Sequence, residues 1–190
     1  MSDDHLNCEE IRCEHLIQDQ WIDFRRSAYR FPDGRVFEPY YSYSRRDYAV
    51  IVASDEEGRF LCVRQFRQGI RQVTTEFPAG GIERKDGESC TAEQALAAAK
   101  RELLEETGCE SAQWTHLLTV PSQATLSDNF AWIFRAENCR PVAGQRLDDM
   151  ELLDVLKFSP SEIEEMIFSG RFQQAVHVAA WLLACRRDGR

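Results

Sequence analysis

The sequence has no long hydrophobic run, no excess of positive charge and no paired set of cysteines, and each absence excludes a class of protein. No apolar stretch reaches the roughly 20 residues that a transmembrane helix needs. The first residues, MSDDHLNCEEIRCEH, are acidic and lack the apolar centre of a signal peptide. A formal net charge of −9 argues against a basic surface for nucleic acid. We therefore expect a cytoplasmic protein that binds neither membranes nor nucleic acid.

The cysteines do not form a disulfide pattern, because they number seven and are scattered through helix-like and strand-like segments. Free thiols in a reducing compartment fit this distribution. His5, Cys8, Cys13 and His15 could in principle hold zinc. Their spacing, H-x2-C-x4-C-x-H, matches no common structural zinc pattern, so an exposed N-terminus is the simpler interpretation.

The length of 190 residues, of which 43% are hydrophobic, suits one domain with a short N-terminal element. The pattern predicts an irregular or short helical lead over 1–16 and a β-hairpin over 17–44, which turns at Pro32-Asp33-Gly34. We expect residues 1–44 to form this N-terminal element and residues 45–190 to form the main domain. Further strands are expected over 48–53, 60–66, 74–77, 116–120, 130–136 and 152–158.

Three helices are expected among these strands. A capping box at Thr91 begins a helix that Gly108 is placed to end. A second capping box predicts a helix over 159–170, and residues 173–186 are apolar nearly all round, which predicts a buried terminal helix. His177 lies within that last segment and is expected to be packed rather than to act as a base. Strands interrupted by a few helices predict an α/β fold, with a mixed sheet and helices on both faces.

The helix after Thr91 carries glutamates on one side. Glu102, Glu105 and Glu106 lie at i, i+3 and i+4, so they share one stripe. Carboxylates this close repel each other, and a hard dication such as Mg²⁺ relieves the repulsion because it prefers oxygen ligands. Arg101 lies four residues before Glu105 and can pair with it. Taken alone, these residues could also form a solvated acidic helix face.

The full order of residues around these glutamates is more specific. The stretch from Gly87 to Cys109 resembles the Nudix box, G-x5-E-x7-R-E-U-x-E-E-x-G-U, in which U is aliphatic. Every fixed position is met except the last aliphatic one, which is Cys109. An alternative register uses Gly80 or Gly81 as the first glycine, with the Gly87-Glu88 pair before the helix, and leaves Glu93 outside the motif. Both registers share Arg101, Glu102, Glu105, Glu106 and Gly108.

Two segments upstream of the box narrow the resemblance. VRQFR at 63–67 and TEFPAG at 75–80 are similar to the VRQ(Y/F)R…E(L/F)PAG signature of the ADP-ribose and nucleotide-sugar pyrophosphatase branch of this family. The resemblance covers roughly residues 36–185. It implies the Nudix α/β/α sandwich, Mg²⁺ or Mn²⁺ as cofactor, and hydrolysis of a nucleoside diphosphate sugar, such as ADP-ribose or GDP-mannose. The products would be a nucleoside monophosphate and a sugar phosphate.

The resemblance also implies roles for single residues. Metal would be bound by the backbone carbonyl of Ala79 together with the three helix glutamates, of which Glu105 and Glu106 are also catalytic candidates with Arg101. Arg64 and Arg67 are candidates to grip the diphosphate, because guanidinium suits phosphate oxygens. Glu76 is expected among the substrate-binding residues. A surface ion pair is the alternative role for each arginine.

A carboxylate from a loop after the box is expected as well. The segment 147–155 resembles the acidic region that supplies it in relatives, where it coordinates metal or activates the attacking water. Glu151 aligns best and Asp149 second. The segment 120–129 lies where relatives carry a loop near the substrate, but Asn129 replaces the usual acid there.

The resemblance further implies a homodimer, in which the N-terminal strands pair with a second copy. Aromatic residues of these strands stack on the nucleotide base in relatives, and the candidates here are Trp21, Phe24, Tyr41 and Tyr43, although simple packing would also explain them. Two other functions stay open. One is hydrolysis of another nucleoside diphosphate derivative, and the other is a non-catalytic Nudix module that senses a nucleotide sugar.

Overall fold

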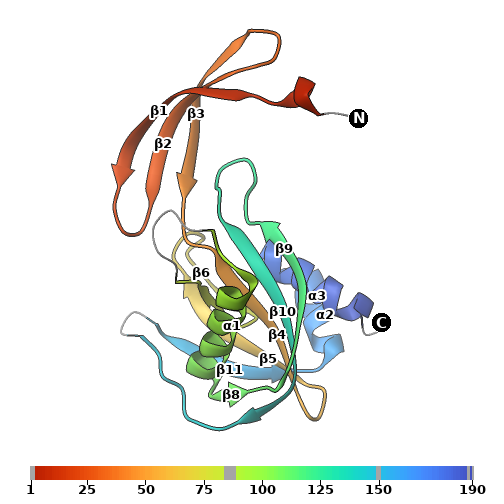
Figure 1. Ribbon diagram of the computed structural model, residues 1–190. Helices are drawn as coiled ribbons and strands as arrows, with labels where there is room; N and C mark the ends of the chain where they lie inside the picture. The colour runs from red at the N-terminus through yellow and green to blue at the C-terminus, as the bar shows by residue number, and fades with distance from the viewer. Residues whose placement is uncertain (1–2, 84–88, 149–150, 188, 190) are drawn as a thin grey trace. The chain divides into compact units, whose positions relative to one another are not determined.

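The chain divides into two compact units in the computed structural model, which describes residues 3–83, 89–148, 151–187 and 189 (Figure 1). Unit 1 consists of residues 1–46 and 121–129, and unit 2 consists of residues 47–120 and 130–190. Each unit has its own sheet, so we describe the two separately.

The sheet of unit 1 is an antiparallel meander of three strands within the described residues. The strands are β1 (Glu9–Gln18), β2 (Asp23–Arg30) and β3 (Val36–Ser44), and a short 3-10 helix, η1 (Asp4–Leu6), precedes them. The hairpin predicted from the Pro-Asp-Gly turn is therefore present as β2 and β3. The irregular or short helical lead predicted for residues 1–16 is correct only at its start, where η1 lies, because residues 9–16 belong to strand β1. Every residue of β1 is exposed, so its sequence lacks the alternation of buried and exposed side chains that marks a strand.

The segment 121–129 belongs to unit 1 because it is bound to β3. The amide of Tyr43 donates to the carbonyl of Leu126 at 2.8 Å, and Tyr43 forms a parallel bridge with Ser127. The hydroxyl of Tyr40 donates to the carbonyl of Thr125. This segment is separated from β3 by more than 70 residues of sequence, so its place in unit 1 is a tertiary feature.

The sheet of unit 2 is mixed, as predicted. Its main path is β11-β5-β4-β10-β8, and β6, β7 and β9 pair with β5, β4 and β10 respectively. β10 runs parallel to β4, whereas the pairs β4–β5, β5–β6, β4–β7, β5–β11 and β8–β10 are antiparallel. The strands are β4 (Tyr48–Asp55), β5 (Phe60–Arg67), β6 (Gln72–Glu76), β7 (Ala79–Gly81), β8 (Cys109–Glu110), β9 (Gln113–Pro121), β10 (Phe130–Pro141) and β11 (Leu153–Phe158).

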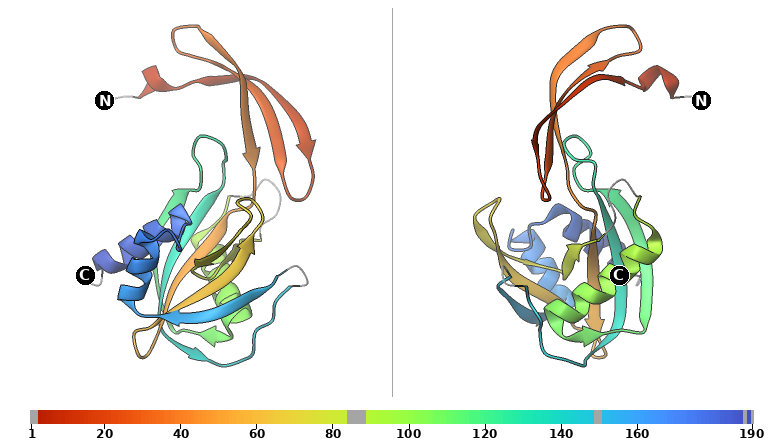
Figure 2. Two further views of the ribbon diagram at one scale, coloured as in Figure 1. Left: turned by 180° about the vertical axis from the view of Figure 1, so that it is seen from behind. Right: turned by 60° about the vertical axis from the view of Figure 1, so that its left-hand side comes forward.

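Helices cover both faces of this sheet (Figure 2). On one face, α1 (Ala92–Thr107) packs Ala99 and Leu103 into a core cluster that also contains Leu61 of β5. On the other face, α2 (Pro160–Phe168) and α3 (Ala175–Arg187) pack against the alternate side chains of the same strands. The predicted α/β sandwich is thereby confirmed. No helix in the described ranges is long and apolar enough to span a membrane.

Local sequence determines where the helices of unit 2 begin and end. Both predicted capping boxes are formed, at Thr91 and at Ser159. Gly108 ends α1 at a φ of 68°, in the left-handed region that favours glycine. The predicted buried terminal helix is present as α3, but only the side of it that meets the sheet is buried. Leu182, on the other side, is 60% exposed.

The seven cysteines are free thiols, which agrees with the absence of a disulfide pattern in the sequence. Cys8 and Cys13 are exposed in unit 1. Within the described part of the chain, neither these residues nor any other group of three or more His, Cys, Asp and Glu side chains is gathered as a metal ion would require. The N-terminal cluster therefore has no metal-binding arrangement in this structure.

Candidate active site

Helix α1 directs two of its glutamates toward the sheet of unit 2. Glu102 is 7% exposed and Glu106 is 2% exposed, whereas Glu105 is half-buried. Glu102 and Glu106 are one helical turn apart, so they point to the same side. The stripe of acidic residues predicted from the sequence is therefore a buried feature and not a solvated helix face.

Gly80 of β7 allows Glu102 to lie directly against the sheet. A Cβ atom built on Gly80 would lie 1.9 Å from Cδ of Glu102, so no residue with a side chain fits there unless the carboxylate moves. Gly80 is paired with Ala49 of β4, which limits how far the strand itself could shift. The PAG turn and the acidic helix, which the sequence shows as separate motifs, thus form one site.

Ala79 of the same turn holds the second buried glutamate. Its amide donates to Oε2 of Glu106 at 3.1 Å. The backbone before it is fixed as well, because the amide of Ile51 donates to the carbonyl of Pro78 at 2.9 Å. The carbonyl of Ala79, which the resemblance implies as a metal ligand, therefore belongs to a firmly held peptide segment.

Arg101 links the glutamates of α1 to each other and to β7. Its Nη1 donates to Oε2 of Glu105 at 2.7 Å, which is the ion pair predicted from the spacing. Its Nη2 donates to Oε1 of Glu102 at 2.7 Å and to the carbonyl of Gly81 at 3.0 Å. One guanidinium therefore balances part of the negative charge and orients two carboxylates.

Burial, and after it the neighbouring negative charge, shifts the pKa values of the buried pair Glu102 and Glu106. Burial raises the pKa of Glu102 to about 7, Arg101 opposes the rise, and the charges of Glu105 and Glu151 add to it. Burial also raises the pKa of Glu106 well above its ordinary value, and the charges of Glu102 and Glu151 add to that rise. Glu151 itself is exposed, and its carboxylate accepts from the amide of Asp148 at 3.1 Å. The negative charge of Glu151 therefore acts on both buried glutamates of α1.

The donor atoms of this site fit a hard divalent cation, because they are carboxylate and carbonyl oxygens. Glu102, Glu106 and the carbonyl of Ala79 would supply ligands, and a cation would stabilise the charged carboxylates that burial, and after it the neighbouring negative charges, disfavour. Arg101 already occupies one oxygen each of Glu102 and Glu105. The side chains would therefore have to rearrange around a bound ion, which agrees with the lack of a preformed cluster among the described residues.

The two arginines of the VRQFR segment lie on opposite faces of β5. Side chains alternate along a strand, so Arg67 shares the face of Leu61, which packs under α1, and Arg64 shares the face of Cys62, which packs under α2 and α3. Arg64 is exposed and forms no ion pair with any residue that the structure describes. Arg67 therefore lies on the opposite face of β5 from Arg64, and its counter-ion Glu76 is also bonded to Gln174, just before α3.

Glu76, predicted to bind substrate, is completely buried, at 0% exposed. All its bonds go to protein groups. Gln65 Nε2 donates to it at 2.8 Å and Thr74 Oγ1 at 3.2 Å, and the side chains of Arg67 and Gln174 donate as well. In this structure Glu76 holds Arg67 in place and has no surface open to a substrate.

His177 of α3 is packed, as predicted, but it also has a specific partner. It is 2% exposed, and its Nδ1 accepts from the amide of Phe77 at 3.1 Å. The sequence offered a signal for this contact, because His177 is the one polar residue in the apolar run 175–185. The function of Gly80 was also missed, since only the folded structure shows what a Cβ there would meet.

The position of Glu93 in the structure is relevant to the choice between the two registers of the Nudix box, because only one register includes this residue. Glu93 is exposed in the first turn of α1, and nine residues, or two and a half turns, separate it from Glu102. It therefore projects to the opposite side of the helix. Gly87 and Glu88, which the other register uses, lie outside the described residues, and so does Asp149.

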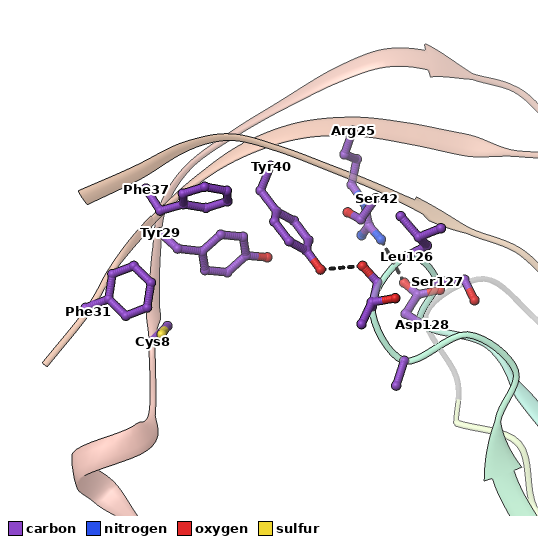
Figure 3. Close-up of a pocket in the computed structure, with 12 residues that line it drawn as sticks. Cys8, Arg25, Tyr29, Phe31, Phe37, Tyr40, Ser42, Leu126, Ser127 and Asp128 are labelled. Carbon is purple, nitrogen blue, oxygen red and sulfur yellow. Dashed lines mark hydrogen bonds and ion pairs between the residues drawn. The ribbon is translucent and has the colours of Figure 1, made fainter. Parts of the chain in front are cut away.

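Unit 1 has a pocket of its own, with a volume of about 380 Å³ (Figure 3). Tyr29, Phe37 and Tyr40 line one side of it, and residues 124–128 line another. None of the four aromatic residues that the sequence suggested for base stacking is among its lining residues. Two of those, Phe24 and Tyr41, stack on each other with ring centroids 5.8 Å apart.

Comparison with known proteins defines the class of this fold and site. Residues 44–180 match the NUDIX domain, which covers more than half of the chain. The chain therefore belongs to the Nudix family, and it is a Nudix hydrolase of the branch that the VRQFR and EFPAG segments indicated.

The chain is also similar to particular proteins and to a solved structure. The chain is 25% identical to the ADP-ribose pyrophosphatase of Bacillus subtilis (strain 168) over 165 residues, which are 86% of this chain and 85% of the relative. It is also 25% identical to the methanol dehydrogenase activator of Bacillus methanolicus over 131 residues, which are 68% of this chain and 67% of the relative. A solved structure described as an ADP compounds hydrolase has the same fold, with a TM-score of 0.81, 20% identity and 100% of each chain covered.

Proposed function

We propose that this protein hydrolyses the diphosphate bond of a nucleoside diphosphate sugar, with ADP-ribose as the first candidate, to a nucleoside monophosphate and a sugar phosphate. The observation that carries the proposal is the buried pair Glu102 and Glu106, held against the PAG turn with its charge only partly balanced. The signature segments and the relative named ADP-ribose pyrophosphatase support the choice of substrate class.

Nudix hydrolases generally use divalent metal ions, and we propose Mg²⁺ or Mn²⁺ for this site. Glu102, Glu106 and the carbonyl of Ala79 would bind the metal, and Glu105 would bind it or orient its neighbours. When bound, such ions neutralise phosphate charge and make a water molecule a better nucleophile. The chain's own contribution is to hold these oxygens on one side of α1 and to keep them from bulk water.

Arg67 is the residue we assign to the diphosphate, because a guanidinium donates to two phosphate oxygens at once. The guanidinium of Arg67 donates to Glu76, and the burial of Glu76 prevents water from competing for this hydrogen bond. Glu151 is our candidate for the base that accepts the proton of the attacking water, or for a further ligand. Arg64 lies on the other face of β5 and remains the weaker candidate for substrate contact.

We also propose that unit 1 mediates homodimerisation and that the protein works in the cytoplasm. All residues of β1 are exposed, so this edge strand has both faces and one edge free to meet a second copy. The free thiols fit a reducing compartment. Light scattering at micromolar concentration tests the dimer, and a monomer mass contradicts it.

The decisive experiment measures turnover of ADP-ribose and GDP-mannose with Mg²⁺ and identifies the products. Glu106→Gln should abolish most of the activity, and Glu93→Gln, on the exposed side of α1, is the matched control. Full activity of Glu106→Gln would refute the site. Activity only toward another nucleoside diphosphate derivative would keep the site and correct the substrate.

A further inference from the structure

The segment 76–81 is held from both faces of the sheet of unit 2. On the α1 face, Glu106 accepts from the amide of Ala79, and Arg101 donates to the carbonyl of Gly81. On the other face, α3 approaches the start of the same segment through His177. The α1 contacts belong to the site described above, whereas those of α3 have no part in it so far.

The contact between α3 and this segment replaces a missing backbone partner. β6 ends at Glu76 and β7 begins at Ala79, so the amide of Phe77 lies between the two strands. Phe77 is completely buried, and water cannot reach its amide. His177 Nδ1 accepts from this amide at 3.1 Å, so one side chain of α3 satisfies the backbone at the point where the chain passes from β6 to β7.

The residues around His177 keep its imidazole neutral, which is the form whose Nδ1 can accept a hydrogen bond. The rings of His177 and Phe77 stack with centroids 6.4 Å apart and an interplanar angle of 10°, and Trp181 stacks on Phe77 from the same helix. Burial lowers the pKa of His177 to about 4, so the ring is neutral and Nδ1 keeps its lone pair. The proton of the neutral ring is therefore on Nε2.

We propose that His177 is a positioning residue of the metal site, which fixes the amide of Phe77 and thereby the carbonyl of Ala79 two residues further on. The inference rests on the proposed function of Ala79 as a metal ligand. A leucine at position 177 would fill nearly the same space but leave a buried amide unsatisfied. The backbone at Phe77 would then shift toward another acceptor for that amide, against the bond from Ile51 to the carbonyl of Pro78, and this shift would displace the Ala79 carbonyl relative to Glu106.

The test measures Mn²⁺ binding to the substrate-free protein by the EPR signal of the free ion. Asparagine can place its Oδ1 where Nδ1 lies, so His177→Asn should bind Mn²⁺ within about twofold of wild type, whereas His177→Leu should bind about tenfold more weakly or worse, in the range seen when supporting partners of metal ligands are removed. Cys185→Ala is the matched control. Cys185 is a buried residue of α3 in the same core cluster, so its truncation lowers the melting temperature while the Nδ1 acceptor of His177 stays in place.

The outcomes separate the inference from the proposed function. Wild-type protein that binds no Mn²⁺ refutes the metal site and the inference with it. Equal binding by wild type and His177→Leu refutes the inference alone, and so does weakened binding by Cys185→Ala to the extent seen for His177→Leu. If His177→Leu does not fold, His177→Met replaces it, because the unbranched side chain repacks more easily. Fast hydrogen exchange of the Phe77 amide in wild type would also refute the inference.

Discussion

Unit 2 buries two carboxylates, Glu76 and Glu106, to almost the same degree, but the two differ in the number of hydrogen bonds that they accept. Glu76 receives hydrogen bonds from four side chains, among them the guanidinium of Arg67. Glu106 receives one from the described residues, the backbone amide of Ala79, and Glu102 and Glu151 repel it. Burial alone therefore does not distinguish the proposed metal site. The distinguishing feature is a buried carboxylate that accepts few hydrogen bonds and lies beside other negative charges. Such a carboxylate is stable in its charged form only when a cation binds to it.

The largest expected effect comes from neutralising each carboxylate in turn. Glu106→Gln should lower kcat by about 10²–10³-fold, since metal ligation contributes several kcal/mol to the transition state. The pKa of Glu106 is raised, so its charge destabilises the metal-free fold as the pH rises above the ordinary range of a glutamate. Glu106→Gln should therefore raise the melting temperature of the metal-free protein at pH 8, measured by calorimetry in EDTA.

Glu76→Gln should have the opposite effect on stability. It leaves the guanidinium of Arg67 without its buried counter-ion, so the melting temperature should fall, by an amount that corresponds to about 3 kcal/mol. A fall in stability for both variants would show that Glu106 is as well satisfied as Glu76. The distinction between a structural and a metal-binding carboxylate would then be lost.

The second prediction concerns how the free energy of unfolding depends on pH through His177, a neighbour of Glu76. The pKa of His177 is lowered to about 4 in the folded state, by burial first, while Glu76 raises it and Arg67 lowers it further. The unfolded state therefore binds more protons between about pH 4 and 6.5, so the stabilising contribution is present above pH 6.5 and is lost as the pH falls through this window. The difference in unfolding free energy between wild type and His177→Asn should change by up to about 3 kcal/mol over it.

Urea titrations of both proteins at several pH values measure this change. The difference between the two proteins is the relevant quantity, because the raised pKa of Glu102, about 7, gives the opposite pH dependence in both. A raised carboxylate pKa means that stability is lost as the pH rises through that value. Parallel pH profiles for wild type and His177→Asn would contradict a neutral, buried His177.

The third prediction compares the two arginines of β5. Arg67→Lys keeps a positive charge beside Glu76 but loses the planar fork that binds two phosphate oxygens, so KM for ADP-ribose should rise by about tenfold. Arg64→Lys is the matched change on the opposite face and should stay within about twofold of wild type. Steady-state kinetics with saturating Mg²⁺ decides between them. Equal losses would mean that substrate contacts both faces of the strand.

Much of the site could be predicted from short-range sequence. The caps of α1 and the glutamate stripe depend on residues within a few positions of each other, and both are as expected. The alternation along β5 was also available from sequence, and it would have separated Arg64 from Arg67. By contrast, strand β1 could not be predicted, because the exposure of both its faces removes the usual pattern. The contact of Gly80 with Glu102 and the bond from Phe77 to His177 join segments 22 and 100 residues apart, and no local rule encodes them.

The smallest expected effect comes from substituting a third acidic residue, Glu93, which we compare with Glu76 and Glu106. Glu93 satisfies the written Nudix pattern, yet it is exposed and lies on the side of α1 away from Glu102. Water solvates its exposed carboxylate, so Glu93 needs neither the protein hydrogen bonds that Glu76 receives nor the cation that we propose for Glu106. Glu93→Gln should leave kcat/KM within about twofold and lower stability by less than about 1 kcal/mol, through loss of a favourable charge at the helix N-terminus. A tenfold loss of activity with Mg²⁺ would instead make Glu93 a member of the site and favour the literal register.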